Sequence, residues 1–169
     1  MKLIIVFVFL SWPVFAHEKQ KHREHSAHAH GAGSLGIAFE GLKGKIDFKI
    51  PSDSIFGFEY AAKSDKDKIR RDEGLAKLET KIYEMVVFDS SLNCKIIKDK
   101  IEVLAESPKH SDTAATYNVT CEKSPVGTEV VFNFQKHFPK IKDLDVQVIV
   151  DNVQKSVEAK KNNTKLFLK

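Results

Sequence analysis

The chain of 169 residues has little of three things: cysteine, long apolar runs and net charge of one sign. Its two cysteines have no C-x-x-C neighbour, which argues against a cysteine-based zinc site. The formal net charge is only +4 and the charges are interspersed, so no nucleic-acid partner is expected. The sequence has no Gly-rich phosphate loop, no H-E-x-x-H metalloprotease motif and no recognisable nucleophile motif. We therefore predict that the protein is not an enzyme.

The main apolar stretch lies at the N-terminus and is short. It runs from Leu3 to Ala16, 14 residues, whereas a membrane-spanning helix needs about 20. A preceding Lys2 and the Val14-Phe15-Ala16 end are typical of a secretory signal peptide. We predict a signal peptide over residues 1–16, cleaved after Ala16, and a mature protein that does not span a membrane. A short uncleaved anchor or a core helix is the alternative.

Histidines are concentrated directly after this stretch. Residues 17–33 hold five of the seven histidines, carry no long apolar side chain and end in Gly31-Ala32-Gly33. Such a segment buries too little surface to fold alone, so we expect a mobile tail in front of a domain over residues 34–169. Neutral imidazole is a good ligand for zinc, copper and nickel. The predicted metal ligands are His17, His22, His25, His28 and His30.

The identity of the metal stays open on these residues alone. After cleavage, His17 would offer both its ring and a free α-amine, a pair that suits copper(II) at least as well as zinc. A copper-binding or metal-resistance protein is therefore one alternative. Others are a solvated linker, a vector-derived tag, or a docking module for a transport system with an incidental tail.

Further candidate ligands lie in a turn expected over Glu106–Asp112. His110 and Asp112 are the weaker candidates there, since histidines and acids in turns are usually just exposed. His137, beside Phe138-Pro139, is expected to be a surface or partly packed histidine rather than a ligand. We also expect a disulfide between Cys94 and Cys121, each in a strand-like segment, because an even pair in an oxidising compartment usually pairs.

Apolar spacing predicts an α+β domain. Alternation over 35–39 and 46–50 indicates a β-hairpin, and the clearest late strand covers 144–150. Helical spacing behind a Ser64-x-x-Asp67 cap predicts a helix over about 65–85. The expected fold is a single domain of antiparallel β-hairpins packed on one longer helix, with one disulfide.

Other segments predict smaller features. The alternation slips at Lys98-Asp99-Lys100, which indicates a bulge. Gln135 to Lys140 is expected to form a short helical turn, and Leu166-Phe167-Leu168 is expected to dock as an edge strand.

The junction between tail and domain resembles a known family. The run H-x-H-G-x-x-x-L-x-I-A-x-E-G, from His28 to Gly41, looks like the start of ZrgA-like periplasmic zinc-uptake proteins. Five further features fit in order and spacing over the mature chain: Gly57-Phe58-Glu59, Cys94 before one strand, Tyr117-x-x-x-Cys121 in the next, His137-Phe138-Pro139 and Leu144-x-Val146-Gln147-Val148.

The resemblance implies a bacterial periplasmic protein that binds zinc and has no catalytic activity. It implies cooperation with an outer-membrane receptor or inner-membrane transporter components. Members of the family often carry a long His- and acid-rich insertion between the two cysteine-bearing strands. Here only residues 107–112 stand in that place. The N-terminal cluster is therefore expected to carry most of the zinc.

Overall fold

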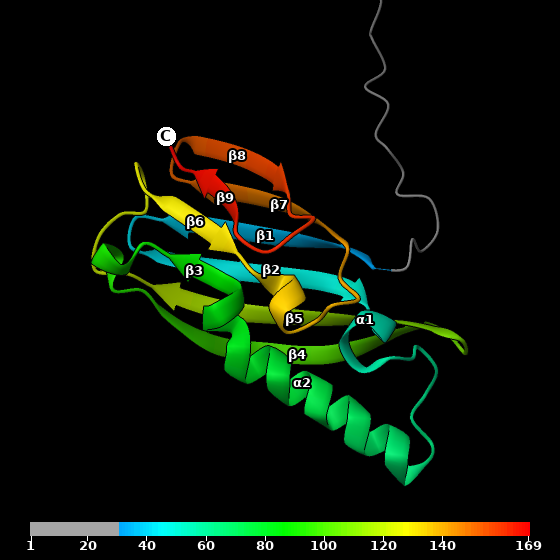
Figure 1. Cartoon of the computed structure of the whole chain (residues 1–169). Coiled ribbons are helices and arrows are strands. Elements are labelled where there is room, and N and C mark those ends of the chain that lie inside the picture. Colours follow the sequence, from blue (N-terminus) through cyan, green and yellow to red (C-terminus); the bar gives the residue numbers. More distant parts are fainter. Residues whose placement is uncertain (1–30) are drawn as a thin grey trace, which may run out of the picture.

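The computed structural model describes residues 31–169, which form two β-sheets and one long helix (Figure 1). The predicted signal peptide and the five histidines from His17 to His30 lie outside the described residues. The first strand begins at Ala32, slightly before the predicted domain boundary.

The larger sheet has six strands in the order β4-β5-β2-β1-β7-β8. Its strands are β1 (Ala32–Glu40), β2 (Lys43–Pro51), β4 (Lys95–Ser107), β5 (His110–Thr120), β7 (Asp143–Val150) and β8 (Val153–Glu158). The expected hairpin is confirmed, since Leu35 pairs with Phe48 across β1 and β2. Leu35 also pairs with Val146 in β7, and this pairing is parallel. The hairpins are antiparallel as predicted, but this parallel pairing between two of them, at the centre of the sheet, was not predicted.

A second layer covers one face of the large sheet (Figure 1). It contains helix α2 (Asp65–Met85) and a three-stranded sheet of β3 (Val86–Phe88), β6 (Glu129–Phe132) and β9 (Thr164–Phe167). Three short helices join these elements: α1 (Asp53–Phe56), η1 (Ser90–Leu92) and η2 (Phe134–Lys136). The α+β prediction holds, but strands outweigh helix, and much of the large sheet packs on a second sheet rather than on the helix.

Helix α2 begins and ends where the sequence predicts. The Ser64 hydroxyl accepts a hydrogen bond from the Asp67 amide at 3.1 Å, which satisfies one of the free N–H groups of the first turn. Gly74 lies where α1 crosses the helix. A Cβ there would stand 3.0 Å from the Ile55 carbonyl oxygen, so the close approach of α1 accounts for a glycine inside a helix.

The core lies between the two layers. Phe48 from β2 stacks on Phe134 from η2, with ring centroids 5.3 Å apart and planes at 11°. Tyr117 from β5 is fully buried, and its hydroxyl donates to the Leu78 carbonyl of α2 at 3.0 Å. These contacts fix the second layer on the large sheet.

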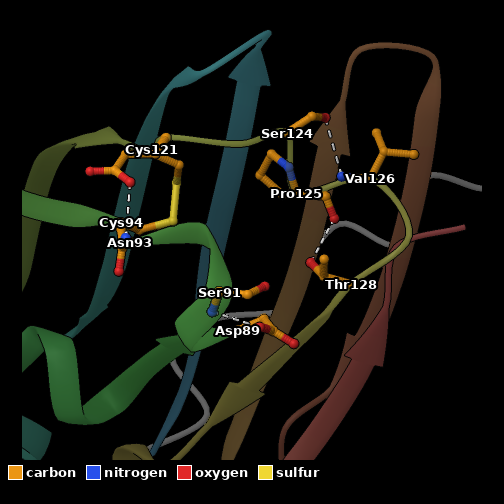
Figure 2. The surroundings of a disulfide bond; sticks show 10 residues. Asp89, Ser91, Asn93, Cys94, Cys121, Ser124, Pro125, Val126 and Thr128 are labelled. Atoms are coloured by element: carbon orange, nitrogen blue, oxygen red, sulfur yellow. Dashed lines mark hydrogen bonds between the residues drawn. A yellow bond between two sulfur atoms is a disulfide. The ribbon is translucent and has the colours of Figure 1, made fainter.

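The predicted disulfide is present at one end of the β4–β5 pair (Figure 2). Cys94 immediately precedes β4 and Cys121 immediately follows β5, so the bridge joins neighbouring strands. Close to it, the Asn93 side-chain amide donates to the Glu122 carboxylate at 2.9 Å, just beyond the ends of the same two strands. The cysteines are thus structural and supply no metal ligand.

The other end of the β4–β5 pair is a tight hairpin. Pro108 and Lys109 alone form the turn, and β5 already begins at His110. The predicted seven-residue turn is therefore too long, and Asp112 lies inside a strand. The predicted bulge is confirmed by a register shift between Lys98 and Lys100.

Because Tyr117 is buried, the free energy of unfolding should fall at alkaline pH. Desolvation raises the pKa of the Tyr117 hydroxyl well above its ordinary value of 10.0. The neutral form is therefore favoured by folding, and its contribution is complete below about pH 10 and is lost as the pH rises further. We expect Tyr117→Phe to cost about 1 kcal/mol at pH 8 through the lost hydrogen bond.

The same substitution should flatten the loss of stability above about pH 10, where the wild type loses up to about 1.4 kcal/mol per pH unit from this group. Urea unfolding between pH 8 and 11 measures the difference between the two proteins. Tyr83→Phe is the matched control, because Tyr83 is 60% exposed. Parallel pH curves for wild type and Tyr117→Phe would contradict the prediction.

Candidate metal-binding residues

The sequence-predicted ligands fall into two groups. His17, His22, His25, His28 and His30 lie outside the described residues. His110 and Asp112 lie within them, at the end of the large sheet where β1 enters. Within residues 31–169, no three histidine, cysteine, aspartate or glutamate side chains gather into a group able to hold a metal ion.

His110 is held at the tip of the β4–β5 hairpin. Its backbone amide donates to the Ser107 hydroxyl at 3.1 Å, which fixes the first residue of β5 against the turn. Its ring nitrogen Nδ1 lies 2.9 Å from the Glu59 Oε2. The ring is 46% exposed, while the Glu59 side chain is only 7% exposed. A buried carboxylate thus orients an accessible imidazole.

Glu59 is placed by the segment that follows α1. The Ser111 hydroxyl donates to the Glu59 carbonyl at 2.7 Å, and the Ser52 amide donates to the Ser111 carbonyl at 2.9 Å. The ring of Phe58 packs between Phe56 and Tyr60, with centroids 4.7 Å from each. The sequence analysis gave Glu59 no functional role and named it only within the Gly57-Phe58-Glu59 segment of the family resemblance.

Asp112 is engaged in an ion pair. Its Oδ2 lies 2.8 Å from the Lys49 Nζ, and its side chain is only 10% exposed. Glu106 lies 3.3 Å from the same ammonium group. The hydrogen bond to Asp112 is the main cause of a raised pKa for Lys49. The charge of Asp112 is therefore balanced by a lysine, which makes it a poorer metal ligand than His110.

His137 also pairs with a glutamate, in a different way. Its Nε2 lies 3.1 Å from the Glu84 Oε2, and its ring is only 13% exposed. Hydrogen bonds from Lys81 and Lys136 lower the pKa of Glu84 to about 2, so this carboxylate stays ionised. His137 is thus a packed histidine in an ion-pair network, as the sequence suggested.

A shallow groove runs over the uncovered face of the large sheet. It has a volume of about 1170 Å³, and its floor includes small residues such as Ser34, Gly36 and Ala114. Ala32 and Asp112 both line it, so it reaches the end of the sheet at which β1 begins.

No helix within residues 31–169 is long and apolar enough to cross a membrane. No curated protein matches the chain. The family model described as "ZrgA family zinc uptake protein" matches residues 27–168. The match includes His28, His30 and His110, and it begins after His17, His22 and His25. It concerns zinc and gives no support to the copper alternative. Because the match covers most of the sequence, the chain belongs to the ZrgA family of zinc uptake proteins.

Proposed function

We propose that the protein binds zinc outside the cytoplasm and supports its uptake as a scavenger, buffer or donor. The observation that carries this proposal is the family match over residues 27–168. Zinc binds chiefly through the cluster of His17, His22, His25, His28 and His30. The protein binds its cargo and does not transform it chemically.

The chemistry of the cluster suits reversible binding. Zinc takes four ligands in tetrahedral geometry, and imidazole is among its usual ligands in proteins. Ordering a polar segment around the ion costs conformational entropy, so the affinity is modest. Imidazole binds metal only when neutral, and an ordinary histidine has a pKa near 6.5, so zinc is released below about pH 6.

The periplasm is the proposed location. The signal-peptide pattern over residues 1–16 and the Cys94–Cys121 bridge both support export to an oxidising compartment. Zinc would then pass to or from an outer-membrane receptor or inner-membrane transporter components. Transcription of the gene should rise when zinc is withheld from the source organism, and an unchanged level would count against a role in uptake.

Replacing the five tail histidines with serine should remove most of the bound zinc. The loss of imidazole ligands should weaken any remaining binding by at least about tenfold, or 1.4 kcal/mol. Calorimetric titration of the mature chain at pH 7.5 gives both stoichiometry and affinity. His137→Ala is the control, because His137 is packed against Glu84. Unchanged stoichiometry and affinity in the serine variant would show that the cluster is not the site.

A further inference from the structure

We propose that the outward side of helix α2 binds a basic amphipathic helix of a partner protein. This outer α2 face consists of an apolar column, an acidic column beside it and a hollow between α2 and β4. The proposal goes beyond zinc binding and does not depend on it, because the face contains none of the candidate zinc ligands.

The two columns follow from the spacing of residues along the helix. An α-helix has 3.6 residues per turn, so residues seven positions apart lie on the same side, nearly one above the other. The members of the apolar column are Ile69, Ala76 and Tyr83. The members of the acidic column are Asp65, Asp72 and Glu79. Each of these six residues is exposed, whereas the opposite side of the helix is buried from Gly74 to Met85.

The apolar column offers accessible surface at both ends of the face. Ile69 is 58% exposed and Tyr83 is 60% exposed. They are 14 positions apart, so they lie about 21 Å from each other along the helix axis. Figure 1 shows α2 beside β4, with the opposite side of the helix facing away from both sheets. Partner helices bind such faces through apolar residues at similar spacing, and tyrosine is a frequent anchor in protein interfaces.

The charges of α2 are sorted by side. The helix contains six acidic and six basic residues, so its own net charge is zero. At 100° per residue, no lysine or arginine lies within about 60° of Ala76 around the helix axis. Glu73 borders the apolar column on the side opposite the acidic column. The outer α2 face is therefore acidic in a chain of formal net charge +4, and it attracts a basic partner. A second copy of the same face would bring acid against acid.

Each acid of the column contacts a base in the structure: Asp65 with Lys68 at 3.1 Å, Asp72 with Arg71 at 2.8 Å, and Glu79 with Lys98 at 2.8 Å. The three acidic side chains are nevertheless 93%, 63% and 43% exposed. Exposed ion pairs contribute little to stability, so these contacts can be exchanged for contacts with a partner at small cost.

The hollow lies beside the acidic column, where α2 meets the edge strand β4. Its volume is about 290 Å³, at the lower end for a small-molecule pocket. Leu75, Ala76 and Ile101 give it an apolar lining. Asp72 and Glu79 also line it, so carboxylates lie next to the apolar surface. This combination suits one arginine or lysine, whose aliphatic stem packs on apolar surface while its charged end reaches a carboxylate.

The first test measures binding of a synthetic helical peptide to the full mature chain in zinc-free buffer. The peptide carries leucine at heptad spacing, with lysine and arginine on both sides. Tyr83→Ser should weaken its binding at least about tenfold, as expected for an interface anchor. Asp72→Asn combined with Glu79→Gln should also weaken it at least about tenfold and reduce its dependence on salt. Thermal unfolding of these variants should resemble that of the wild type, because the replaced side chains are exposed.

Two controls separate this face from charge in general. Glu40→Gln combined with Asp47→Asn removes the same two charges from exposed positions in β1 and β2 and should leave the peptide affinity unchanged. A peptide with glutamate in place of its lysines and arginines should not bind. Absence of binding by the basic peptide, or equal losses in the control and the Asp72/Glu79 variant, would overturn the proposal.

The second test locates the contact. On titration with the basic peptide, NMR signals of backbone amides should shift in residues 65–83 of α2 and 98–101 of β4. Shifts confined to other elements would overturn the proposal. Sedimentation of the chain alone should show a monomer, and a dimer that dissociates on Tyr83→Ser would assign the face to a second copy and overturn the basic partner. None of these results bears on the proposed zinc binding.

Discussion

Replacing Cys94 and Cys121 with alanine should lower the free energy of unfolding by about 3.5 kcal/mol, the chain-entropy value for a loop of this length. The bridge restricts the unfolded chain, and its loss makes unfolding more favourable. A domain of this size has a total stability of about 5–15 kcal/mol, so the change is large. Urea unfolding of the double variant and the wild type gives the difference.

Two comparisons isolate the covalent bond. Wild-type protein unfolded in the presence of a thiol reductant should match the double variant. Asn93→Ala removes only the neighbouring hydrogen bond to Glu122 and should cost no more than about 1 kcal/mol. A cost below about 1 kcal/mol for the double variant would mean that the β4–β5 pair stabilises itself without the bridge.

Phe134→Ala should cost about 3–5 kcal/mol, the usual range for a buried phenylalanine. The ring of Phe134 is buried and stacks on Phe48, so it joins the second layer to the centre of the large sheet. Its removal leaves a cavity between elements that cannot close without moving a whole layer. Chemical denaturation with fluorescence and circular dichroism measures the loss.

Matched variants test the cause of this effect. Phe134→Leu keeps most of the volume and should cost less than Phe134→Ala. Phe167→Ala truncates the same side chain at an edge strand where it is 44% exposed, and it should cost clearly less than Phe134→Ala. Equal costs for Phe134→Ala and Phe167→Ala would contradict the assigned role of the Phe48–Phe134 stack.

The sequence predicted the elements whose characteristic pattern lies within a single segment. The hairpin of β1 and β2 and the late strand β7 alternate because one face of each is buried. Helix α2 has both its apolar spacing and its Ser64 cap within one segment. These features depend on neighbours in sequence, so one segment suffices to recognise them.

Other features depend on partners far along the chain. The parallel pairing of Leu35 with Val146 leaves no trace in either strand, because a buried face looks the same whichever direction its neighbour runs. Strand β3 has only three residues, too few to show a period. Strand β4 was predicted on both sides of its bulge, but its extension to Ser107 was not, because β4 lies at the edge of the sheet and is exposed over most of its length.

The candidate ligands also differ in how far the sequence predicts them. The N-terminal histidine cluster can be recognised from the sequence alone, because its members lie close together along the chain. Glu59 and His110 are 51 positions apart, and no local pattern links the two residues. Only the packing of the segment after α1 against the start of β5 brings the carboxylate to the ring. The contact between Glu59 and His110 could therefore not be predicted without the fold.

Strand β1 lies at the centre of the large sheet, and one of its edges stays unpaired until β7, in the last third of the chain, has been synthesised. Gly41 and Asp151, which are hydrogen-bonded at the end of this pairing, are 110 positions apart. The β4–β5 hairpin and its bridge depend on nearby residues alone. Oxidation can therefore precede closure of the sheet, and a chain lacking β7 would expose an apolar edge strand prone to self-association.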